Sequence, residues 1–162
     1  MSRLSVTVAA YGAFAPAAAD WDDLDRAVAR GDVELIDAAL FERDDTQVVQ
    51  FHEYSAAGWG DGLVASAVLG LLSPPALLVG AVAGSVGGHM ITALSKGLSR
   101  EALSELGRVM EAGRFVVVAL ADRGESQTTS VPGDRSLALA SLPVGATVLG
   151  LREALDADRA DA

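Results

Sequence analysis

Apolar residues recur with strand or helix periods on both sides of a long uncharged stretch. Residues Leu4 to Tyr11 first alternate apolar and polar side chains and then become apolar, which predicts a strand with at least one buried face. The next segment places Trp21, Leu24 and Val28 on one face of an amphipathic helix that ends at Gly31. The chain therefore opens with a strand followed by a helix.

The same reasoning predicts three more strands and one more helix. Residues Val33 to Phe41 and Thr46 to Tyr54 are rich in strand-forming side chains and flank an acidic turn, so they predict a β-hairpin. Ser99 is a good N-cap for a helix from Arg100 to about Ala112. Residues Phe115 to Ala121 are almost continuously apolar, as expected for a central strand covered on both faces.

Small residues recur every four positions in the stretch from Gly58 to Ser95. The first series is Gly58, Gly62, Ser66 and Gly70, and the second contains Gly80, Gly84 and Gly88. On helices this spacing keeps the small side chains on one face, where another backbone can approach closely. A reversal at the Pro74-Pro75 pair would bring the two series together as an antiparallel helical hairpin.

This hairpin needs a partner for its apolar faces. No Asp, Glu, Lys or Arg occurs from Gly62 to Ser95, and the faces away from the small residues are rich in Leu, Val, Ala and Ile. His89 is the one ionisable side chain in that stretch. It either bonds a backbone carbonyl within the fold or lines a channel in an assembly.

The order of elements predicts an α+β protein with a ferredoxin-like βαββαβ domain, in which two helices cover one face of the sheet. The glycine-rich hairpin would be inserted between the third strand and the second helix. Residues 1–56 and 98–122 would form the two parts of this domain, residues 57–97 the glycine-rich insertion, and residues 123–162 a loop, weak elements and an acidic tail.

The last forty residues carry weaker patterns. Leu137 to Leu142 fits either a short helix or an extended segment, and Val144 to Leu151 predicts an edge strand. The acidic end from Arg152 to Ala162 fits a final helical turn or a frayed tail.

Residues 4 to 122 resemble an uncharacterised bacterial family whose members are often labelled predicted membrane proteins of unknown function. The resemblance lies in the strand Val33 to Phe41, the charged turn, the glycine-rich hairpin, the sequence Leu103-Ser104-Glu105-Leu106 and the strand Phe115-Val116-Val117-Val118. It implies a ferredoxin-like domain interrupted by a glycine-zipper hairpin, and it brings no catalytic residues. Members continue with another clear helix and strand, whereas residues 124 to 132 here have a loop composition.

Composition excludes several classes of function. The formal charge of −10 and the scarcity of Lys and Arg argue against a nucleic-acid partner, and the absence of cysteine excludes a thiolate metal site or a cysteine nucleophile. The amino-terminal residues lack the pattern of a signal peptide. His52 fits a surface or packing role, and the acids Asp20, Asp22, Asp23 and Asp25 fit a solvated helix start.

These observations predict a non-enzymatic, self-assembling or adaptor protein without a cofactor, in which residues 58–95 mediate homo-oligomerisation. The oligomerisation residues would be the seven members of the two small-residue series together with His89. One alternative is a membrane-associated protein with the hairpin in the bilayer, and a second is a small-ligand sensor. The first interpretation places the protein in the cytoplasm and the membrane alternative at the cytoplasmic membrane.

Overall fold

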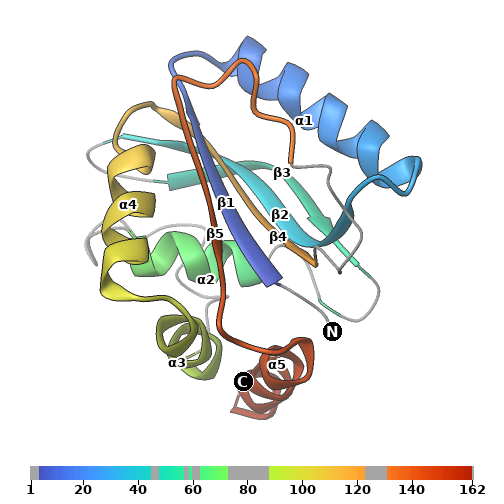
Figure 1. Ribbon diagram of the computed structural model, residues 1–162, viewed down its shortest axis with the longest axis vertical. Coiled ribbons are helices and arrows are strands. Elements are labelled where there is room, and N and C mark those ends of the chain that lie inside the picture. Colours follow the sequence, from blue (N-terminus) through green and yellow to red (C-terminus); the bar gives the residue numbers. More distant parts are fainter. Residues whose placement is uncertain are drawn as a thin grey trace.

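The protein folds as a five-stranded antiparallel sheet with helices on both faces (Figure 1). The computed structural model describes residues 4–44, 48–56, 59, 63–72, 88–122 and 131–161. In chain order the elements are β1 (Leu4–Tyr11), α1 (Phe14–Ala29), β2 (Glu34–Arg43), β3 (Val48–Ser55), α2 (Leu63–Leu72), α3 (Gly88–Gly97), α4 (Arg100–Met110), β4 (Phe115–Asp122), β5 (Ala138–Pro143) and α5 (Val148–Asp161). The predicted α+β class is confirmed.

Two apolar cores lie on opposite faces of the sheet. All eight residues of β1 are buried, and β2 and β4 are buried along most of their length, so the central strands have apolar side chains on both faces. Trp21 and Leu24 of α1 cover one face. Val68 of α2, Leu106 of α4 and Leu151 of α5 belong to the core on the other face. A sheet that is apolar on both sides requires such a cover on each.

The strand order differs from the predicted ferredoxin-like arrangement. The observed order is β3-β2-β4-β1-β5, so the central positions fall to β2, β4 and β1, and a fifth strand occupies the edge beside β1. The helices also lie on both faces, whereas the prediction placed two helices on one face. The reason is that β4 is apolar on both sides and takes the central position, pairing with β1 on one edge and β2 on the other.

The carboxyl-terminal prediction was partly wrong. The extended alternative for Leu137 to Leu142 is confirmed, because β5 covers most of that segment and pairs with β1. The edge strand predicted over Val144 to Leu151 is absent from this part of the described chain, since α5 begins at Val148. The acidic end is also helical through Asp161. Leu151 and Leu155 explain the helix, because both are completely buried one turn apart on the same side of α5.

The two predicted arms of the glycine-rich hairpin are described only in part. Within the described residues, the first arm is α2 and the end of the second is α3, and these two helices pack together. Figure 1 shows α2 lying across the view and α3 seen close to its axis. The expected reversal at Pro74-Pro75 and the glycines at positions 58, 62, 80 and 84 lie outside the described residues.

Gly113 allows the closest backbone approach between the end of the α4 segment and the sheet. A Cβ atom added at Gly113 would lie 2.5 Å from the carbonyl oxygen of Tyr11, far inside van der Waals contact. A Cβ added at Gly107, within α4, would meet no atom within 4 Å. The two glycines therefore offer a matched comparison of one crowded and one open position.

We expect Gly113→Ala to lower the free energy of unfolding by about 1–3 kcal/mol, because the backbone of β1 must shift to admit the methyl group. Gly107→Ala should leave stability unchanged or raise it by up to about 1 kcal/mol, since alanine favours a helix interior. Urea denaturation followed by circular dichroism measures both. Equal denaturation midpoints for the two variants would contradict the crowding seen at Gly113.

Candidate assembly site

The first arm of the predicted assembly element is buried against the protein's own sheet. Five side chains of α2 have no exposed surface: Val64, Ala65, Ala67, Val68 and Leu69. They join the core formed with β2 and β4. The apolar face that the sequence left without a partner is therefore covered, for this arm, within the same chain.

Asp37 anchors the start of α2 to the sheet. Its carboxylate has no exposed surface, yet it accepts a hydrogen bond from the backbone amide of Ala65 at 2.8 Å and another from the hydroxyl of Ser55. The first amides of a helix have no partner within the helix and carry a partial positive charge. A carboxylate in this position satisfies both the helix and its own need for donors.

A β-bulge places Asp37 where α2 can use it. The register of β2 against β4 shifts between Leu35 and Asp37, so Ile36 is the extra residue. Leu35 and Ala38 both lie in the core on the α1 side, whereas Ile36 lies in the core on the opposite side. Alternation continued from Val33 and Leu35, which both lie on the α1 side, would turn Asp37 toward α1. After the bulge, Asp37 instead alternates with Ala38 and lies on the α2 side.

Asp158 performs the equivalent role for α3. Its carboxylate, 7% exposed, accepts hydrogen bonds from the backbone amides of His89 and Met90, each at 2.9 Å, and lies 2.9 Å from Nδ1 of His89. Burial alone would raise the pKa of Asp158, but the hydrogen bonds from Met90 and His89 outweigh it, and the pKa falls below its usual value of 3.8. The second aspartate therefore holds the second helix start.

Helix α5 contacts both ends of the glycine-rich segment. Arg152 stacks over the ring of Trp59, with its guanidinium carbon 4.9 Å from the ring centroid, and Trp59 is only 3% exposed. Six residues further along the same helix, Asp158 binds the start of α3. We call α5 with these two side chains the α5 clamp.

The four described residues of the predicted assembly set fall in different environments. Ser66 is 2% exposed in α2, Gly70 is half-buried, and Gly88 and His89 are exposed. His89 therefore pairs with α5 at the surface. Among the described atoms, none lies within 4 Å of a Cβ built at Gly88.

Gly97, which lies outside both small-residue series, is tightly packed. A Cβ there would be 2.9 Å from a methyl carbon of Val144 and 3.1 Å from the amide of Ala146. The amide of Gly145 also donates to the carbonyl of Gly97 at 2.6 Å. The end of α3 is thus fastened to the segment that leads into α5.

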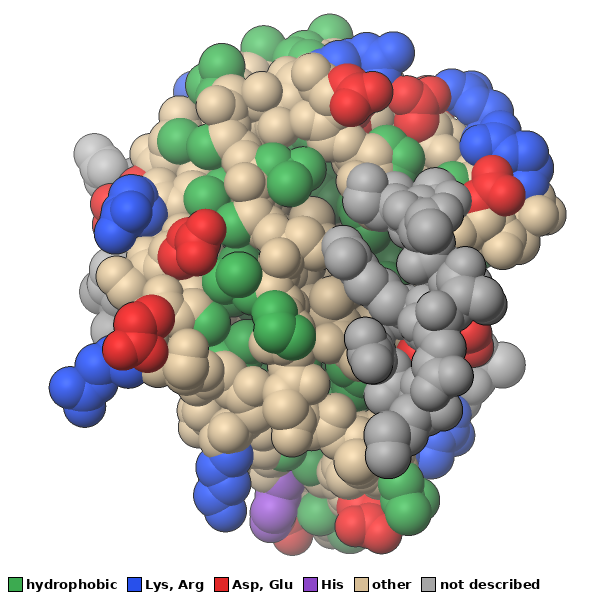
Figure 2. Space-filling model, viewed as in Figure 1, with side chains coloured by type: hydrophobic (Ala, Val, Ile, Leu, Met, Phe, Trp, Pro, Cys, Tyr) green, Lys and Arg blue, Asp and Glu red, His purple; other side chains and the backbone are tan. Residues whose placement is uncertain are grey.

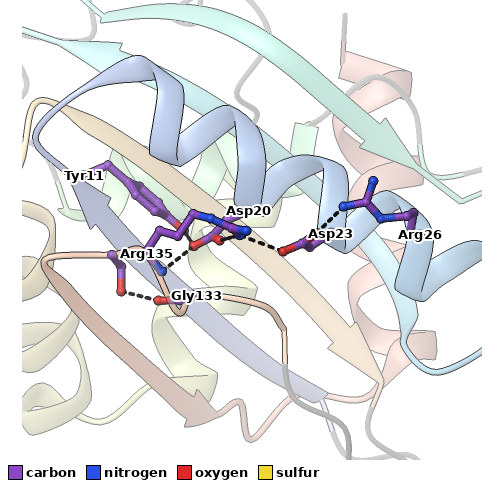
Figure 3. Close-up of polar contacts among 7 residues, drawn as sticks. Tyr11, Asp20, Asp23, Arg26, Gly133 and Arg135 are labelled. Atoms are coloured by element: carbon purple, nitrogen blue, oxygen red, sulfur yellow. Dashed lines mark hydrogen bonds and ion pairs between the residues drawn. The ribbon is translucent and has the colours of Figure 1, made fainter.

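A polar network on the other face of the sheet fastens α1 (Figure 3). Asp20, with its side chain 1% exposed, accepts hydrogen bonds from the Tyr11 hydroxyl at 2.7 Å and from the Arg135 side chain at 2.6 Å. Arg135 also pairs with Asp23 at 2.7 Å. Burial and the neighbouring Asp20 raise the pKa of Tyr11, and hydrogen bonds from Arg135 and Arg26 lower that of Asp23.

These contacts assign Asp20 and Asp23 of α1 to packing between elements. Asp20 and Asp23 join α1 to β1 and to the segment before β5, which is a cross-link between elements distant in sequence. Nowhere in the described ranges do three or more His, Asp or Glu side chains lie together so that they could hold a metal ion.

A shallow groove runs between α4 and β5, on the face shown in Figure 2, where hydrophobic side chains gather over β5 and acidic ones over α4. Its volume is about 470 Å³. The residues that line it are Gly97, Ser99, Glu101, Ala102, Glu105, Leu142, Pro143, Val144 and Gly145. This groove offers two carboxylates and an apolar wall but no residue set typical of catalysis.

A cluster of aromatic rings lies between α1 and β3, and no sequence pattern indicates it. Phe14 lies 5.4 Å from Phe51 and 5.8 Å from Phe115, measured between ring centroids. The ring of His52 stacks on Trp21 at 5.7 Å. Spacing along the chain could not reveal this cluster, because its members come from three elements.

No protein-family model, curated protein or solved structure matches this chain. The resemblance of residues 4 to 122 to a bacterial family therefore stays a prediction. Among the helices of the described ranges, none combines the length and the apolar character needed to cross a membrane.

We expect Asp158→Asn to lower the free energy of unfolding at pH 7 by about 1–2 kcal/mol, because an amide cannot accept from both helix amides as a carboxylate does. The pKa of Asp158 is depressed in the folded state, so its stabilisation is complete above the unfolded pKa and is lost as the pH falls through the lower folded pKa. The difference in unfolding free energy between the wild type and Asp158→Asn, called the stability gap below, should stay constant from about pH 7 to 5 and shrink below about pH 4.

Urea denaturation of both proteins across this pH range measures the gap. Asp156→Asn is the matched control, because the Asp156 side chain lies on the same helix and is 68% exposed. A gap that is absent at pH 7, or that persists unchanged at pH 3, would contradict the capping role of Asp158.

Proposed function

We propose that the protein is a non-enzymatic, self-associating protein whose glycine-rich segment joins copies of the chain. The observation that carries the proposal is the double anchoring of this segment. Asp37 of β2 fixes the start of α2 and Asp158 of α5 fixes the start of α3, so the chain on both sides of residues 73–87 is anchored to the fold.

The sequence between the two anchored helices supports association. Residues 73–87 contain no Asp, Glu, Lys, Arg or His, and Gly80 and Gly84 continue the four-residue spacing that lets helices approach closely. The charge of −10 is carried entirely by the remainder of the chain. Copies meeting through this segment would avoid bringing like charges together.

Two alternatives have a specific observation in their favour. A bilayer could take up the same apolar segment, and the resembling bacterial family is often labelled as membrane proteins. The groove between α4 and β5, with Glu101 and Glu105 on its rim, is compatible with a small cationic ligand. The two anchored helices flank residues 73–87, which belong to the longest uncharged stretch of the sequence. This arrangement favours self-association over the two alternatives.

Substituting Val82 with Asp should convert the associated protein to a monomer, because a carboxylate in the uncharged segment would be buried without a partner. The Gly80→Leu, Gly84→Leu double variant should also dissociate, because the larger side chains separate the backbones. Size-exclusion chromatography with light scattering, without detergent, measures the mass. Leu149→Asp is the matched control, because Leu149 is 66% exposed on α5.

Three results would contradict self-association. They are a monomeric wild-type protein, an unchanged mass for the Val82→Asp and double-glycine variants, or the same loss of mass with Leu149→Asp. Flotation with anionic vesicles separates the alternatives. Vesicle binding by a monomer, abolished by Val82→Asp, would favour the membrane interpretation.

A further inference from the structure

The strand β3 ends the sheet, and its outer edge has no neighbouring strand among the described residues. Proteins protect such an edge with proline, charged side chains, a short strand or a β-bulge. The opposite edge, β5, has six residues and ends at Pro143. By contrast, β3 has eight residues and contains neither Pro nor Lys, with Glu53 as its charged residue and a bulge at Phe51. By strand length and by the absence of Pro and Lys, the edge formed by β3 is the less protected of the two.

An exposed aromatic patch adjoins this edge. We define it as Phe14, Val49, Phe51 and His52, of which Phe14 is 41%, Val49 36% and Phe51 46% exposed. The ring centroid of Phe51 also lies 6.3 Å from that of Phe115, which is largely buried. Large aromatic side chains that keep almost half of their surface in water are typical of binding sites when they occur together.

A second β-bulge creates the patch. The pairing of β3 with β2 passes from His52 opposite Leu40 to Gln50 opposite Phe41, so Phe51 is the extra residue. Phe51 and His52 both contact Phe14, which shows that two consecutive side chains point to the α1 side of the sheet. The edge strand thus presents a denser apolar row than regular alternation allows.

Acidic residues predominate in the part of the chain that carries the patch. The described part of residues 4–56 carries ten Asp or Glu and three Arg. Asp25 is exposed on α1 one turn after Trp21. Glu53 pairs with Ala39 of β2, so it lies on the sheet face opposite to the patch, where it accepts a hydrogen bond from the Gln50 side chain. Neither of these two acids forms an ion pair with the described residues.

The nearby arginines of α1 do not neutralise this surface for a partner. Arg26 pairs with Asp23, and Arg30 pairs with Asp32, so both are engaged with acids of the same region. A second copy of the chain would bring the same excess of acids to the edge, whereas a basic segment would be attracted.

We propose that β3 binds an extended basic segment of another protein, which adds to the sheet as a sixth strand. Its alternate apolar side chains lie on the aromatic patch, and its Lys or Arg side chains lie on the opposite face of the sheet, on the side of Glu53. Main-chain hydrogen bonds along the edge supply affinity, and the apolar patch on one face with Glu53 on the other selects an alternating apolar and basic sequence. This interaction is separate from the glycine-rich segment and from self-association.

The test uses the full-length protein and two synthetic eight-residue peptides, matched to the length of β3. One alternates lysine with valine and phenylalanine, and the other replaces every lysine with glutamate. Isothermal titration calorimetry should detect binding of the basic peptide, at least about tenfold stronger than of the acidic one and weaker at high salt. Amide shifts in the NMR spectrum should concentrate on β3.

Phe51→Thr should weaken binding of the basic peptide by about tenfold or more, because threonine keeps the strand but removes the exposed ring. Glu53→Gln should weaken it less and reduce its salt dependence. Leu149→Thr is the control, because it removes an exposed apolar side chain of α5, and it should bind as the wild type does.

Four outcomes would overturn the proposal. The first is that neither peptide binds, and the second is that both bind equally. The third is peptide binding unaffected by Phe51→Thr. The fourth is a different occupant, shown by Phe51-dependent dimerisation without peptide, which would indicate a second copy, or by Phe51-dependent vesicle binding.

Discussion

A buried carboxylate decides how the helical layer lies on this sheet. Asp37 has no exposed surface, and a carboxyl group in that position is tolerated only when hydrogen-bond partners surround it. Its donors include the Ser55 hydroxyl and the backbone amide of Ala65 in α2. This need links β2, β3 and α2, and α2 in turn contacts α3 and α4. The position of one buried carboxyl group thus constrains the layer that carries the candidate site.

Much of the secondary structure could be predicted from the sequence, because apolar periodicity is a local signal. The strands β1 to β4, the helix α1 and the Ser99-capped helix α4 fall where the pattern placed them, within a few residues. The strand order could not be predicted in this way, because it depends on which distant strands pair. The helix α5 was also missed in part, because Leu151 and Leu155 obtain their burial from contacts with elements far along the chain.

The candidate site was predictable to a lesser degree. The small-residue spacing identified the segment, but it did not identify the aspartates that anchor it, which lie 28 and 69 positions from the amides they bind. Both bulges were equally invisible, although each places a residue on an unexpected face, Asp37 in β2 and Phe51 in β3. A bulge has no reliable sequence signal where neither glycine nor a turn marks it.

The α5 clamp also has a consequence for the order in which the protein is synthesised. The amide of His89 leaves the ribosome 69 residues before the carboxylate of Asp158 that caps it. At roughly 5–20 residues per second, the glycine-rich segment waits on the order of several seconds without its C-terminal restraint. During translation, the longest uncharged stretch of the chain is therefore available to chaperones, to a membrane or to neighbouring nascent chains before α5 can hold it.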